Sequence, residues 1–107
     1  MTAAQFRKIA LSFPEAVESA HNGHPDFRVG GKIFGTLGYP DQAFAVVMLN
    51  SEEQSLFIKL DAETFTPVKG AWGQQGSTII RLRPARSAMV RESVEAAWRR
   101  RAPKRLL

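Results

Sequence analysis

The chain of 107 residues contains no cysteine. This absence excludes disulfide bonds, thiolate zinc ligands and a cysteine nucleophile, and it fits a reducing compartment. Long apolar segments are also missing, since the main apolar run covers only Phe44 to Leu49 and residues 1–8 lack the apolar core of a signal peptide. A run of that length does not cross a bilayer. We therefore expect a cytoplasmic protein that makes no membrane contact.

Sequence motifs for the common catalytic mechanisms are missing as well. The chain has no Gly-x-Ser-x-Gly segment, which presents the serine nucleophile in many hydrolases. Residues 70–78 contain three glycines followed by Ser77 and Thr78, but a P-loop needs a lysine directly before the Ser/Thr and a helix after it. Gly76 occupies the lysine position, so a backbone site for an anion is the most that this segment offers. We expect a protein that is not an enzyme and that holds no cofactor.

Acidic residues are scarce in the C-terminal quarter of the chain, where basic residues gather. Residues 81–107 contain nine Lys/Arg and two Asp/Glu, a net charge of +7, while residues 1–80 contain six Lys/Arg and eight Asp/Glu, a net charge of −2. Such an asymmetry points to a polyanionic partner. It is also typical of a solvated helix end, because cations interact favourably with the helix dipole there. Both interpretations stay open at this point.

Apolar spacing and turn residues predict seven elements in one domain. The expected helices cover about residues 3–13, 52–60 and 84–102, and the expected strands cover 26–29, 32–37, 44–49 and 78–83. The segment 14–22 has an ambiguous pattern and is expected to be a loop with at most a turn of helix. The order α-β-β-β-α-β-α implies an α+β fold of two layers, an antiparallel sheet with helices packed on one face.

The best-defined local structure is a β-hairpin that turns at Gly30 and Gly31, which tolerate a positive φ. With a two-residue turn, Arg28 pairs with Ile33 and Phe27 pairs with Phe34.

Two further local features follow from the pattern. Ser51 and Gln54 have the spacing of a capping box at the start of the second helix. The apolar positions predict one core, made of Phe6, Ile9, Phe13, Phe27 or Phe34, Val46, Leu56, Ile80, Val94 and Trp98.

Five segments of the chain occur in a combination that suggests a family. They are Phe13 to Glu18, the hairpin Phe27 to Phe34, the helix beginning at Ser51, the loop Pro67 to Gly73, and Ala97-Trp98 with Ala102 to Leu106. With them the chain resembles the MmcQ/YjbR-like family of small bacterial proteins over almost its whole length. The resemblance implies a frataxin-like α+β fold, sometimes described as a double-wing DNA-binding arrangement, and it carries over no catalytic residues. Such a fold-level analogy says little about function.

Two residue groups are candidates for a metal. His21 and His24, with Asp26 nearby, are of types that metals prefer. An H-x-x-H pair in a loop does not ensure convergent geometry, so we expect instead that one imidazole bonds to local backbone. Iron would require a dense acidic surface, whereas Glu15 and Glu18 are a sparse pair. We expect no metal site.

The turn-rich loop of residues 66–77 is a candidate recognition surface. Its candidate contact residues are Lys69, Trp72, Gln74 and Gln75, which combine an aromatic ring for stacking with amides and a cation. The preferred interpretation is structural, with Trp72 folded back as a plug over the sheet while the glycines permit the tight path.

The basic quarter is the candidate nucleic-acid surface. Its candidate phosphate contacts are Arg81, Arg83, Arg99, Arg100, Lys104 and Arg105. Arg101 continues the apolar stripe of its helix, so its stem is expected to pack while its head reaches water.

From these features we expect a monomeric, non-enzymatic binding module that binds nucleic acid weakly and without sequence preference through the basic cluster. The alternatives are a protein-interaction or regulatory domain that uses the Trp72 loop, and a small-molecule site between hairpin and sheet.

Overall fold

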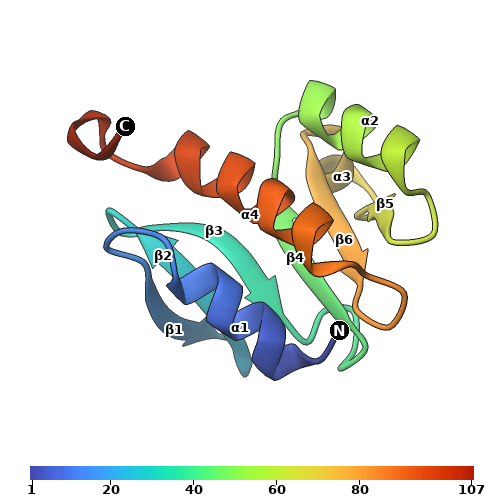
Figure 1. Ribbon diagram of the computed structural model, residues 1–107, viewed down its shortest axis with the longest axis horizontal. Helices are drawn as coiled ribbons and strands as arrows, with labels where there is room; N and C mark the ends of the chain where they lie inside the picture. The colour runs from blue at the N-terminus through green and yellow to red at the C-terminus, as the bar shows by residue number, and fades with distance from the viewer.

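The computed structural model describes residues 1–107 as one six-stranded antiparallel sheet in the order β1-β2-β3-β4-β6-β5, with helices packed against it (Figure 1). The strands are β1 Val17–His21, β2 His24–Val29, β3 Lys32–Leu37, β4 Phe44–Met48, β5 Phe65–Pro67 and β6 Ser77–Arg81. The helices are α1 Ala3–Leu11, α2 Ser51–Leu60, α3 Ala71–Gln74 and α4 Ser87–Arg101, followed by a 3₁₀ turn at Lys104–Leu106. The predicted α+β class is confirmed. None of the helices combines the length and the apolar composition that crossing a membrane requires.

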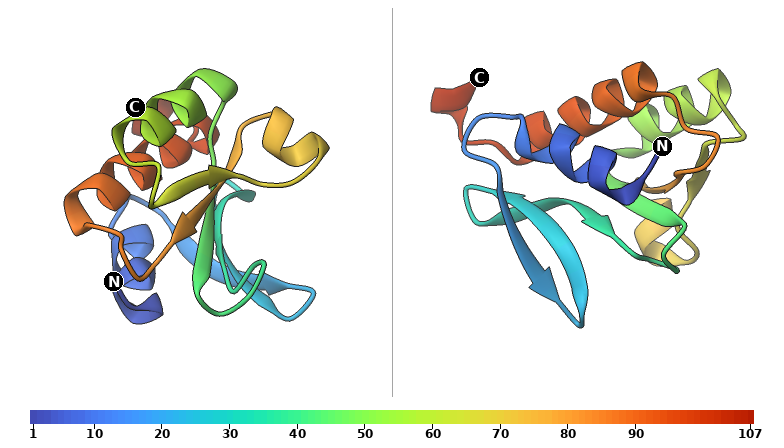
Figure 2. Two further views of the ribbon diagram at one scale, coloured as in Figure 1. Left: turned by 90° about the vertical axis from the view of Figure 1, so that its right-hand side faces the viewer. Right: turned by 60° about the horizontal axis from the view of Figure 1, so that its bottom comes forward.

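The main core lies between the sheet and the helices α1, α2 and α4, which cover one face (Figure 2). The predicted core is largely confirmed, since these members are buried: Phe6, Ile9, Phe27, Phe34, Ile80, Val94 and Trp98. Phe13 is partly buried, and its ring stacks on Trp98 with the centroids 5.8 Å apart. The indole N–H of Trp98 donates a 3.1 Å hydrogen bond to the carbonyl of Pro14. Trp98 thus ties the end of α4 to the segment after α1.

Three short elements were not predicted. Strand β1 lies in the segment expected to be a loop, strand β5 overlaps the start of the loop of residues 66–77, and helix α3 lies within that loop. All five residues of β1 are exposed, so burial imposes no alternating pattern on its sequence. Asn22 and Gly23, both with positive φ, form the turn into β2. The β1–β2 hairpin projects from the body of the protein (Figure 2).

The hairpin of β2 and β3 turns at Gly30 and Gly31 as predicted, and Arg28 pairs with Ile33. The expected pairing of Phe27 with Phe34 is wrong, because the register shifts between Phe27 and Arg28 and Phe27 faces Gly35. A bulge adds one unpaired residue to a strand. Both phenylalanines lie fully buried in the main core.

Helix α2 begins one residue earlier than its predicted capping box. Asn50 is the N-cap, and its side chain and that of Glu53 bond to each other's backbone N–H groups. Gln54 points inward and is 8% exposed, whereas Leu56, predicted to be core, is 53% exposed. Phe57 takes the buried position.

Helix α4 begins at Ser87, later than predicted, because Pro84 lies in the turn that leads into it. Its C-terminal end is at Arg101, two residues before Pro103, as proline's effect on helices predicts.

Candidate binding site on the open sheet face

The face of the sheet opposite the helices carries its own small apolar cluster. Asp26, Thr36, Val46 and Ile79 are successive cross-strand neighbours on β2, β3, β4 and β6. Val46 was predicted to belong to the main core, but both faces of β4 are apolar and Val46 points to the open side. There it packs with Val68 and Ile79, bordered by Phe44 and Met48. We call this side the open face.

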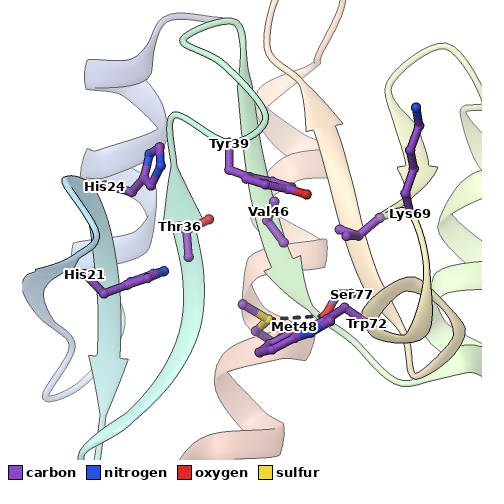
Figure 3. Close-up of a pocket in the computed structure, with 10 residues that line it drawn as sticks. His21, His24, Thr36, Tyr39, Val46, Met48, Lys69, Trp72 and Ser77 are labelled. Carbon is purple, nitrogen blue, oxygen red and sulfur yellow. Dashed lines mark hydrogen bonds between the residues drawn. The ribbon is translucent and has the colours of Figure 1, made fainter.

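A hollow of about 270 Å³ lies over this cluster (Figure 3). Its lining residues come from five strands, two loops and the short helix α3: His21, His24, Thr36, Tyr39, Val46, Met48, Val68, Lys69, Trp72 and Ser77. Tyr39 and Trp72 stand on opposite sides of the apolar floor in Figure 3. Tyr39 is 43% exposed and Trp72 is 67% exposed. Two aromatic rings are therefore available to a ligand at the two ends of one hollow.

The preferred interpretation of Trp72 as a plug is wrong, because two-thirds of the residue is exposed. The loop that carries it is nevertheless held tightly. A Cβ at Gly73 would lie 1.6 Å from the carbonyl oxygen of Val68, so no larger residue fits there. The buried amide of Gln54 donates hydrogen bonds of 2.9 and 3.0 Å to the carbonyls of Gly73 and Ser77. Trp72 is thus an exposed ring on a fixed support.

A polar group at the β2 end of the hollow combines a buried acid with two basic side chains. Arg28 donates hydrogen bonds of 2.8 and 2.9 Å from Nε and Nη2 to the carboxylate of Asp26. His21 Nδ1 lies 2.8 Å from the same carboxylate, so the histidine bonds to this side chain and not to backbone as expected. The hydrogen bonds from Arg28 are the largest influence on the pKa of Asp26, and they lower it. Burial alone would raise this pKa, but Arg28 and His21 together hold it below its usual value. The same contact raises the pKa of Arg28.

The metal candidates do not gather into one site. The rings of His21 and His24 have centroids 6.4 Å apart. No three side chains of the His, Cys, Asp and Glu types come together in a way that could hold a metal ion.

A second hollow adjoins the first and shares His21, Met48 and Trp72 with it. No acidic side chain lines either hollow. Because the buried Asp26 is occupied by Arg28 and His21, a ligand on this face meets basic, polar and apolar groups.

Comparison with known proteins shows the family of the chain. The YjbR family model matches residues 11–100, most of the chain. The protein belongs to the YjbR family. No curated protein and no solved structure matches it significantly. The YjbR match includes every residue that lines the first hollow and ends before Arg101.

In this YjbR-family chain the predicted basic contacts fall into two groups. Arg81 and Arg83 precede helix α4, whereas Arg99 and Arg100 lie in its last turn and Lys104 and Arg105 follow it. A helix of 15 residues is about 22 Å long, which separates the two groups. Arg81 pairs across the sheet with Phe44, and with Arg83 it lines a separate shallow surface hollow. The six predicted contacts therefore do not form one patch.

Three members of the C-terminal group have partners within the protein. Arg99 pairs with Glu95 at 3.3 Å, and Arg105 makes two hydrogen bonds of 2.6 Å to Glu15. Arg100 donates a 2.9 Å hydrogen bond to the carbonyl of Met48. Lys104 is exposed. The spacing of Glu95 and Arg99 in the sequence already allows their pairing, but the sequence does not show that Met48 and Glu15 meet Arg100 and Arg105 from distant parts of the chain.

The recognition-loop candidates have separate positions. Lys69 and Trp72 line the first hollow, while Gln74 and Gln75 are exposed residues outside it. Sequence reasoning missed Tyr39 and Met48, since a tyrosine in a turn and a methionine in a strand carry no signal of a site.

Proposed function

We propose that this protein is a non-enzymatic binding module that holds single-stranded nucleic acid on the open face of its sheet. The observation that carries the proposal is the hollow between Tyr39 and Trp72, two exposed rings above an apolar floor. Unpaired bases stack on aromatic side chains irrespective of sequence, while nearby cations attract the backbone. Lys69 beside the first hollow, with Lys32 and Arg101 beside the second, gives this face cations without lining acids.

The geometry favours single strands over duplexes. Stacking requires bases that are not already stacked in a double helix. The helices α1 and α4 are not available to enter a duplex groove, because they pack against the opposite face of the sheet. The open face is broad and carries its rings at the ends of a hollow.

The C-terminal cluster is better suited to an auxiliary role. An arginine that is already paired with a carboxylate gains less from a phosphate than an unpaired one, because its existing bond must be exchanged. Arg99 and Arg105 both have such partners. We therefore assign the main contact with nucleic acid to the Trp72 loop and the open face of the sheet, and not to the C-terminal cluster.

Fluorescence anisotropy of labelled single- and double-stranded oligonucleotides at two salt concentrations tests this function. Binding to single strands should have a Kd of roughly 10⁻⁴–10⁻⁶ M and should weaken steeply as salt rises, because bound phosphates release counterions. Trp72→Ala should weaken it by about 1–3 kcal/mol, the usual value of one stacked base. Leu60→Ala is the matched control, since Leu60 is 55% exposed on α2, away from the hollow.

Two outcomes would overturn the proposal. One is no binding even at low salt, and the other is equal binding by the Trp72→Ala variant and the wild type. A peptide or small molecule that binds with little salt dependence and is lost on Trp72→Ala would move the function to one of the alternative classes. The cytoplasmic location and the monomeric state stay predictions from the sequence.

A further inference from the structure

The second hollow on the open face is lined by an unusual set of basic side chains. Its volume is about 430 Å³, and its lining residues are His21, Arg28, Gly31, Lys32, Ile33, Met48, Trp72 and Arg101. Three of these are Arg or Lys, one is His, and none is acidic. The set draws on β1, the β2–β3 hairpin, β4, the Trp72 loop and the end of α4.

These residues meet because the hairpin turn docks on the chain that follows α4. Gly30 lies against Pro103, so that a Cβ at Gly30 would be 3.2 Å from Pro103 Cγ and 4.0 Å from the carbonyl oxygen of Arg101. Gly30 also has a φ of +58°, which favours glycine. The close contact brings Lys32, just after the turn, beside Arg101. The cations are therefore positioned by packing and not by chance exposure.

The charge of this hollow is not balanced within the protein. Asp26 is fully buried and accepts two hydrogen bonds from Arg28, which balances one cation. Lys32 and Arg101 supply the remaining charge. The Nε of Arg101 is buried and has no hydrogen-bond partner. A buried, charged donor without an acceptor is costly, and a bound anion is one way to satisfy it.

We infer that the second hollow is a phosphate subsite, in which Arg101 and Lys32 bind one phosphate of the strand whose base stacks on Trp72. This inference rests on the proposed function and adds where the backbone lies. Trp72 lines both hollows, so a base on one side of its ring and a phosphate on the other belong to neighbouring positions of one ligand. The guanidinium of Arg101 supplies donors in a fixed planar fork, and Lys32 supplies a mobile point charge.

The experiment compares adenosine with adenosine 5′-monophosphate by NMR titration of ¹⁵N-labelled protein, with inorganic phosphate as a third probe. The monophosphate should bind about tenfold more tightly than the nucleoside, because charge-assisted hydrogen bonds form only with the phosphate. Inorganic phosphate alone should shift the Nε–H signal of Arg101. Arg101→Gln and Lys32→Gln should each remove most of the tenfold preference and leave adenosine binding unchanged.

Matched variants control for charge and for folding. Arg99→Gln and Lys59→Gln remove the same side-chain types outside the hollow and should leave the preference intact. Arg101→Lys keeps the charge but lacks the guanidinium Nε donor. It should therefore keep part of the preference for the monophosphate that Arg101→Gln removes. Because Arg101 is half-buried and its loss affects packing, Lys32→Gln serves as the second test, since Lys32 is exposed on the hairpin.

The two proposals fail in different ways. If oligonucleotides bind in a Trp72-dependent manner but neither Lys32→Gln nor Arg101→Gln alters affinity or salt dependence, the phosphate subsite is overturned and the proposed function stands. If the Nε–H signal of Arg101 responds to phosphate and no oligonucleotide binds, the proposed function is overturned. Equal affinity for the nucleoside and its monophosphate also contradicts the subsite.

Discussion

Arg105 and Glu15, ninety residues apart in the chain, are joined by two parallel hydrogen bonds of 2.6 Å from the guanidinium to the carboxylate. The bonds fasten the 3₁₀ turn after α4 to the loop after α1, where Glu15 has a φ of +57°. They also hold the pKa of Glu15 below its ordinary value. A side chain that the sequence marks as a free cation thus has a structural partner.

Replacing Arg99, Arg100, Lys104 and Arg105 together with glutamine tests the role of the C-terminal cluster. We expect a small loss of stability, because exposed ion pairs contribute little, and retention of most oligonucleotide affinity. Thermal unfolding and anisotropy of the same variant measure both quantities. Complete loss of binding by a folded variant would return the main contact to this cluster.

The packing of Trp98 supports a larger stability prediction. Trp98 is 4% exposed, stacks on Phe13 and bonds to Pro14. Trp98→Ala should lower the free energy of unfolding by roughly 3–5 kcal/mol. Urea denaturation measures this change, and an unaltered midpoint would show that the α4 packing described here is wrong.

Gln54 is expected to act on binding through the loop that it supports. Gln54→Leu keeps the apolar stem but leaves the carbonyls of Gly73 and Ser77 without their donor, at a cost of about 1–3 kcal/mol. Hydrogen exchange in residues 70–77 should speed up, and oligonucleotide affinity should fall although Gln54 does not line the hollow. Ser55→Ala, on the exposed side of the same helix, is the control. Weakened binding without faster exchange would argue against a positioning role.

The lowered pKa of Asp26 predicts that the protein loses stability in acid. The folded-state pKa of Asp26 is lowered, chiefly by hydrogen bonds from Arg28. The ionised carboxylate of Asp26 therefore contributes fully to the stability of the fold when the pH is above 3.8, its ordinary pKa. This contribution is lost as the pH falls from 3.8 toward the lower pKa that Asp26 has in the folded state. Between pH 7 and pH 3 the wild type should lose more stability than Asp26→Asn, measured by urea midpoints. Parallel losses in the two proteins would contradict this assignment.

The sequence predicted the fold where burial imposes a pattern. Phe6, Val94 and Trp98 were identified from helical spacing, and the turn at Gly30 was identified from its glycines. The prediction failed at β1, whose residues are all exposed, and on α2, where Gln54 and Phe57 are buried and Leu56 is exposed. Local spacing does not reveal either effect.

The candidate site was predicted only in part, because it is made by contacts between distant segments. Lys69 and Trp72 were chosen for their residue types, and both line the first hollow. Tyr39, Met48 and Lys32 join them through the sheet order and the docking of the hairpin on Pro103. The partners of Arg100 and Arg105 likewise became evident only in three dimensions.

The two tryptophans offer the most direct test that the open face binds the ligand. The indole of Trp72 is exposed beside the hollow, whereas that of Trp98 is buried and bonded to Pro14. During titration of ¹⁵N-labelled protein with a short single-stranded oligonucleotide, the indole N–H signal of Trp72 should shift together with the amides of Thr36 and Val46, while that of Trp98 stays in place. Shifts confined to residues 99–105, with the Trp72 signal unmoved, would contradict the account.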